Sequence, residues 1–135
     1  MRNFLAVIIG LVVGGVVNMG IVYISGSIIE PPAGADVTTT EGLKASMHLF
    51  EPKHFIMPFL AHALGTLVGA AVATLIGASR KMTLAMIVGV IFLLGGITMV
   101  FMVPSPTWFA ALDILVAYIP MAWLGYKIGN GMKRS

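Results

Sequence analysis

The sequence predicts an all-α membrane protein, a four-transmembrane-helix up-down-up-down bundle with both termini in the cytoplasm (N-in/C-in). Three observations predict it: the composition, four long apolar runs, and the placement of the basic residues. Of the 135 residues, 59% are hydrophobic and 10% are charged, whereas an average soluble domain has roughly 45–50% and about 25%. Because so few charged side chains cannot cover a soluble surface, we expect residues 1–135 to form a single domain in lipid.

Four apolar runs are long enough to span a bilayer, which needs about 20 residues of helix. We expect the spans at about residues 4–28, 55–79, 82–103 and 107–127. They should be helices, because backbone polar groups in lipid must be satisfied within the segment. The first run is far longer than the roughly 7–15 apolar residues of a signal peptide, so we expect an uncleaved signal anchor that forms the first span.

The connections between these runs are unequal in length. Residues 30–54 form a long polar outer loop, and its opening residues cannot continue a helix: Glu30-Pro31-Pro32-Ala33-Gly34. Within this loop, residues 41–50 have apolar side chains at helical spacing. They form either a short helix on the membrane surface, capped by Thr40, or a polar loop. The connections at 79–81 and 104–106 are short, so they join antiparallel neighbours.

The basic residues fall almost entirely on one side of a four-span arrangement. Only Lys44 and Lys53 lie in the outer loop, together with four of the five acidic residues. The other six basic residues lie at the termini and in the second connection: Arg2, Arg80, Lys81, Lys127, Lys133 and Arg134. Since lysine and arginine are enriched on the cytoplasmic side of membrane proteins, we expect both termini to be cytoplasmic.

Several classes of site are excluded or disfavoured by the sequence. The chain has no cysteine, which excludes disulfides, thiolate metal sites and a cysteine nucleophile. The basic residues form no patch for nucleic acid, and we expect no cofactor. His48, Glu51 and His54 are weak metal candidates. The Glu-x-x-His pattern occurs once, with a proline inside it, and is better explained as a solvated helix start.

Small residues recur at every fourth position in the first two predicted spans. The first span contains Gly10 and Gly14, and the second contains Gly65, Gly69 and Gly77. Because lipid provides no hydrophobic drive between helices, small residues that let two backbones approach usually form the packing face. We therefore expect these two spans to pack along their glycines. The alternative is that the glycines line a permeation path.

Two ionisable residues lie inside the predicted spans, and such residues are costly enough in lipid to indicate a function. At helical rise, His62 lies about 10 Å and Asp113 about 9 Å below the outer surface. Asn18 and Thr98, from the other two spans, reach the same layer, so we predict an intramembrane polar cluster. The sequence favours an interhelical clamp. The alternative is a proton or ion relay, or a pocket for a small ligand, because histidine titrates near neutral pH.

Parts of the chain resemble a group of small bacterial four-span membrane proteins of uncharacterised function. The similar stretches are Phe50-Glu51-Pro52-Lys53-His54-Phe55 with residues 58–70, and Leu112-Asp113 with residues 117–125. The resemblance covers nearly the whole chain and implies a multi-pass protein of the bacterial inner (cytoplasmic) membrane. It supplies no activity, substrate or site residue.

No catalytic site is evident in the sequence, so we expect the protein not to be an enzyme. The leading hypothesis is an accessory or scaffold subunit of a membrane complex, or a small homo-oligomer. Its partners would be the lipid bilayer and other membrane subunits or further copies of the chain. The alternative is a small transporter or channel that uses His62 and Asp113. A cavity that reaches this pair would favour transport, whereas dry packing would favour the accessory role.

Overall fold

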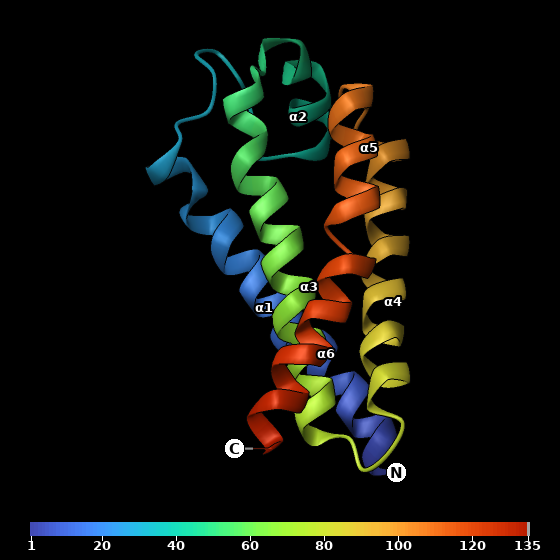
Figure 1. Ribbon diagram of the computed structural model, residues 1–135. Helices are drawn as coiled ribbons and strands as arrows, with labels where there is room; N and C mark the ends of the chain where they lie inside the picture. The colour runs from blue at the N-terminus through green and yellow to red at the C-terminus, as the bar shows by residue number, and fades with distance from the viewer. Residues whose placement is uncertain (135) are drawn as a thin grey trace.

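The computed structural model describes residues 1–134 as a bundle of helices joined by loops (Figure 1). The long helices are α1 (Arg2–Ile28), α3 (Ile56–Ile76), α4 (Lys81–Met102), α5 (Thr107–Val116) and α6 (Ile119–Arg134). The first connection contains α2 (Thr40–Ser46) and two 3-10 turns, Met47–Leu49 and Pro52–Phe55. No strand occurs among these residues, so the prediction of an all-α protein is confirmed.

Four helical segments of the described chain are long and apolar enough to cross a membrane. They are Arg2–Ile28, Pro52–Ile76, Lys81–Met102 and Thr107–Lys133, which confirms the prediction of a multi-span membrane protein. Both ends of the chain lie at one end of the bundle, with the turn at residues 77–80 (Figure 1). We call this the terminal end. The opposite end, with residues 29–55 and 103–106, is the loop end.

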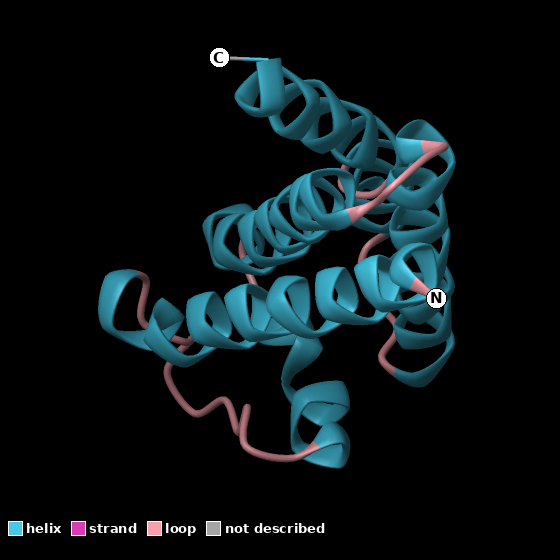
Figure 2. Cartoon of the chain, turned by 90° about the horizontal axis from the view of Figure 1, so that it is seen from below, coloured by secondary structure: helices cyan, strands magenta, loops and turns pink. Residues whose placement is uncertain are grey.

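α3 lies at the centre of the bundle, where it packs against α1, α4 and α6. α1 slants away from the other helices toward the loop end (Figures 1 and 2). The half of the bundle nearer the terminal end is filled by two clusters of buried apolar residues. The clusters are Ala6, Ala73, Leu84 and Val88, and Ala70, Ala85 and Ala122. The helix interfaces in this half are therefore apolar.

The backbones of α1 and α3 touch through four of the predicted glycines. A methyl group built on Gly10 would lie 2.6 Å from the carbonyl oxygen of Gly69, and one on Gly14 would lie 2.5 Å from that of Gly65. Gly77 does not belong to this face. It ends α3, and a side chain there would meet Leu84 of α4. Its four-residue spacing from Ala73 is therefore not a packing signal, because the helix stops at Ile76.

The fourth predicted span, 107–127, is not one continuous helix. α5 ends at Val116 and α6 begins at Ile119. Pro120 explains the break, because proline has no N–H to donate to the carbonyl of Val116 and its ring crowds the preceding turn. α6 then runs on to Arg134, past the predicted boundary at 127.

The first connection folds back onto the bundle. Its helix α2 is capped by Thr39, whose hydroxyl accepts a hydrogen bond from the amide of Gly42 at 2.9 Å, so the predicted cap at Thr40 is wrong by one residue. The apolar stripe of this segment, Leu43, Met47 and Phe50, faces the bundle and lines a cavity at the loop end.

Candidate functional site

His62 of α3 and Asp113 of α5 lie in direct contact. The imidazole Nδ1 is 2.8 Å from Oδ1 and 3.0 Å from Oδ2 of the carboxylate. Tyr118, in the break between α5 and α6, donates its hydroxyl to the same carboxylate at 3.2 Å. The tyrosine ring also stacks on the imidazole, with 5.9 Å between the ring centroids. The carboxylate is thus held from two sides, as a buried carboxylate must be.

The charge of this cluster depends on one proton. Asp113 is only 4% exposed, and its ion-pair partner in the described chain is His62 rather than a lysine or arginine. With a neutral imidazole, Nδ1–H donates to an ionised carboxylate and the pair carries one negative charge. With a protonated imidazole, the pair is neutral overall. A net charge in a low-dielectric region is costly. Binding of a proton to the pair would therefore change the free energy of bringing any other charged group into the site.

The break at residues 117–118 brings Tyr118 to the site. In an unbroken helix, a residue five positions after Asp113 would lie roughly 140° around the axis and face elsewhere. Gly96 of α4 provides the space for the phenol, because a methyl group on this glycine would lie 2.6 Å from the tyrosine Cζ. The geometry therefore depends on both the proline-induced break and a glycine on the facing helix.

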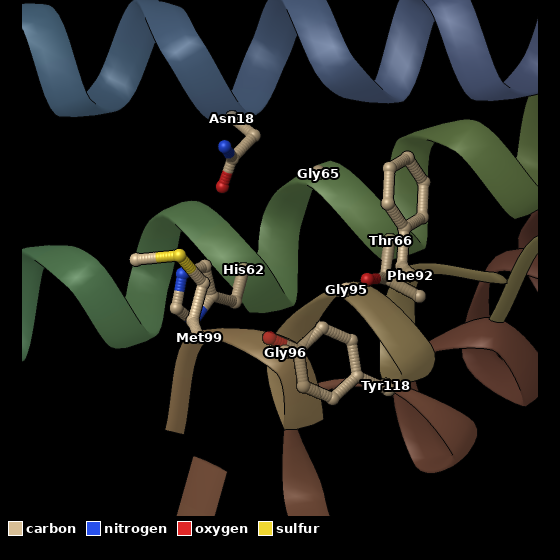
Figure 3. Close-up of a pocket in the computed structure, with 9 residues that line it drawn as sticks. All are labelled: Asn18, His62, Gly65, Thr66, Phe92, Gly95, Gly96, Met99 and Tyr118. Carbon is tan, nitrogen blue, oxygen red and sulfur yellow. The ribbon is translucent and has the colours of Figure 1, made fainter. Parts of the chain in front are cut away.

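A cavity of about 180 Å³ lies beside His62, between α1, α3 and α4 (Figure 3). We call it the polar cavity; its lining residues are Asn18, His62, Gly65, Thr66, Phe92, Gly95, Gly96, Met99 and Tyr118. Two oxygens of its lining residues, Asn18 Oδ1 and Thr66 Oγ1, are buried and have no hydrogen-bond partner among the described residues. Neighbouring atoms cover both oxygens, so they add polar side chains beside the cavity but no exposed acceptor on its surface.

A second cavity, of about 260 Å³, lies on the other side of the pair, toward the loop end. We call it the apolar cavity. It is covered by the α2 segment and shares His62, Gly96 and Met99 with the polar cavity. Asp113 lines it as well. His62 therefore lies where two cavities adjoin, and the apolar cavity extends from the His62–Asp113 pair toward the loop end.

The structure places the other predicted site residues differently. Asn18 reaches the polar cavity, as described above, but Thr98 lies on the exposed face of α4. Its hydroxyl donates to the carbonyl of Leu94 in its own helix at 2.8 Å, a common way for threonine to satisfy its hydroxyl within a helix. Thr98 is thus at the predicted depth but on the wrong face to join the cluster.

The weak metal candidates do not form a site in the described part of the chain. No group of three histidine, aspartate or glutamate side chains there is close enough to hold a metal ion. Nδ1 of His54 accepts a hydrogen bond from the backbone N–H of Glu51 at 2.8 Å, and the Glu51 carboxylate lies 3.6 Å from the ammonium of Lys53. The motif therefore starts a helix, and His48 is exposed nearby.

Two polar residues of the site, Tyr118 and Thr66, are not among those predicted from the sequence. A signal for Tyr118 existed, because a tyrosine inside a span needs a partner for its hydroxyl and Pro120 marks a break beside it. Thr66 lies one helical turn after His62 and is 1% exposed. Its position on the same face of the predicted helix was the available signal.

Comparison of the chain with models of protein families, with curated proteins and with solved structures found no match. The resemblance to small bacterial four-span proteins therefore stays a prediction.

Proposed function

We propose that the protein is a non-enzymatic membrane transporter in which the His62–Asp113 pair takes up and releases a proton. The observation that carries this proposal is the meeting of two cavities at His62. A purely structural clamp has no need of access, whereas a titrating pair must exchange its proton with water or with a ligand. Histidine suits this role because its charge changes between about pH 5 and pH 8.

The apolar packing of the half nearer the terminal end favours a carrier over an open channel. The two apolar clusters, around Val88 and Ala85, fill the helix interfaces between the pair and the terminal end. Apolar packing of this kind would interrupt a continuous water path on that side, as in a carrier with access from one side at a time. By the distribution of basic residues, the accessible loop end faces the outside of the cell.

Proton movement in reconstituted vesicles tests the proposal. Liposomes that contain a trapped pH-sensitive dye, with the membrane potential clamped by potassium and valinomycin, receive an external pH step between about pH 5 and pH 8. We expect the internal pH to change faster with the protein than without it, and Asp113→Asn to abolish the difference. Thr98→Val is the matched control, because its hydroxyl is bonded within its own helix. Equal rates in all vesicles would overturn the proposal.

A homo-oligomer or accessory subunit is the second candidate, and the exposed face of α1 favours it. Val12 and Val16 are 60% and 66% exposed, and Gly15 and Gly20 have no neighbouring atom where a side chain would be. A second helix could approach closely along this face. In native membranes, Val16→Cys should then cross-link to a second copy or to another subunit, whereas Leu115→Cys, which is also exposed, should not. Equal cross-linking would count against a specific interface.

A further inference from the structure

We propose that the terminal end of the bundle binds the headgroup phosphate of an anionic phospholipid through three basic residues from three helices. The residues are Arg2 of α1, Lys81 of α4 and Lys133 of α6, and we call them the basic cluster. Figure 1 shows the start of α1, the turn before α4 and the end of α6 at this one end of the bundle. The site is separate from the His62–Asp113 pair, so the inference goes beyond the proposed function.

The basic cluster gathers positive charge without a counter-ion from the described chain. The side chains of Lys81 and Lys133 lie next to each other, and Lys81 and Arg2 both repel the ammonium of Lys133. No aspartate or glutamate of the described chain lies at this end, because four of them are in the first connection and the fifth is Asp113. Like charges held close together repel, so an anion bound between them would replace repulsion by attraction.

Hydrogen bonds to the backbone hold the start of α1 against the turn that leads into α4. Nε of Arg2 donates to the carbonyl oxygen of the last residue of α3 at 2.6 Å, which uses one of the five N–H donors of the guanidinium. The neighbouring Asn3 accepts the amide N–H of Ala78 at 2.9 Å and donates to the hydroxyl of Ser79 at 3.0 Å. The turn continues directly into Lys81, so two members of the cluster are held near each other before any ligand arrives.

The start of α4 adds to the positive potential of the cluster. The N-terminus of a helix carries a partial positive charge, and acidic residues there are stabilising. α4 has no acidic residue in its first turn and no side chain that caps it, and it begins with Lys81 directly after Arg80. An anion held by the basic cluster would therefore offset the helix dipole as well as the side-chain charges.

The depth of the cluster indicates that the anion belongs to a lipid. α4 has 22 residues, which span about 33 Å at about 1.5 Å per residue, and the hydrocarbon core of a bilayer is about 30 Å thick. The first residue, Lys81, therefore comes at the edge of the hydrocarbon, beside the headgroups. We predict that this end faces the cytoplasm, and anionic lipids give the cytoplasmic leaflet a negative surface potential that attracts basic groups next to a span.

Competition between two lipids, followed by native mass spectrometry, tests the inference. The purified protein in mild detergent receives equal amounts of phosphatidylglycerol and phosphatidylcholine with the same acyl chains, so the net charge of the headgroup is what distinguishes them. We expect the first bound lipid to be phosphatidylglycerol, with a preference of up to about a hundredfold, since each nearby lysine or arginine strengthens binding roughly fivefold. Equal binding of the two lipids would overturn the inference. Displacement by inorganic phosphate at a similar concentration would identify a free anion as the ligand and would also overturn it.

Variants of the two lysines place the lipid at the basic cluster. Lys81→Gln combined with Lys133→Gln should lower the preference roughly twentyfold, whereas Lys81→Arg combined with Lys133→Arg keeps both charges and should retain it. The matched control is Lys44→Gln combined with Lys53→Gln, which removes two exposed lysines of the first connection at the loop end. Equal thermal melting would show that the variants fold. Equal loss in the two glutamine variants, or loss in neither, would place the lipid elsewhere and refute the assignment.

Discussion

Replacement of Gly14 by alanine should separate α1 from α3. The added methyl group would lie 2.5 Å from the carbonyl oxygen of Gly65, 3.0 Å from Cε2 of Phe92 and 3.1 Å from Cα of Gly69. Two of these three atoms belong to the backbone of α3, so they cannot rotate away as the end of a flexible side chain could. The helices must instead move apart.

The size of the movement and its cost follow from these distances. A methyl carbon and a carbonyl oxygen rarely lie closer than 3.0 Å, so the gap must widen by about 3.0 − 2.5 = 0.5 Å at Gly65. Overpacking of this kind costs about 1–3 kcal/mol. Alanine also favours the helix over glycine by up to about 1 kcal/mol, which partly offsets the loss. A matched control is therefore needed to isolate the packing term.

Gly15→Ala provides that control. Gly15 is the next residue of the same helix, and a methyl group there meets no atom within 4 Å, so within one copy of the chain this variant changes helix propensity and not packing. Thermal unfolding of both variants in the same detergent should give a lower midpoint for Gly14→Ala than for the wild type, and an equal or higher midpoint for Gly15→Ala. Equal midpoints in the two variants would refute the close contact of α1 with α3.

Three further predictions concern the polar pair, the topology and the first connection. Asp113→Asn and His62→Gln should each destabilise the protein by about 1–3 kcal/mol, and the double variant should lose less than the sum, because the two side chains touch; strict additivity of the unfolding free energies would argue against the pair. An impermeant thiol reagent should label exposed Ala45→Cys but not exposed Ala78→Cys in intact cells, and the reverse would invert the orientation. The pKa of Asp36 lies below its usual 3.8, because its carboxylate accepts two hydrogen bonds from the threonine two residues later. These bonds therefore stabilise the fold above the unfolded pKa and are lost as the pH falls through the folded pKa, so an NMR titration of this carboxyl should have its midpoint below 3.8.

The architecture could be predicted because lipid imposes strong and simple constraints. Length and hydropathy identified four spans, and the spacing of Gly10 and Gly14 against Gly65 and Gly69 identified the faces that touch in the structure. These patterns repeat with the period of the helix, so they survive an error of a residue or two in a boundary. Gly77 shows the limit, because its spacing continued the pattern past the end of the helix.

The composition of the site was less predictable, because it depends on rotation about the helix axis and on a helix break. Depth alone placed Thr98 beside His62 and Asp113, but a helix of known depth can present any face, and Thr98 faces outward. Tyr118 reaches Asp113 only because the helix is interrupted before Pro120. A break changes the direction of every later side chain, and no periodic pattern in the sequence records by how much.

The energetics of the pair argue against a clamp as its main role, although the sequence favoured one. Polar contacts between membrane helices contribute on average only about 0.6 kcal/mol, whereas removal of a carboxylate from water costs several kcal/mol even after relaxation. Asp113 is 4% exposed, so most of that cost applies to it, and a well-packed apolar pair would hold the helices as firmly. A clamp would also gain nothing from two adjoining cavities. The proposed exchange of a proton at the pair would give both the cavities and the buried carboxylate a common explanation, because stability alone does not require either.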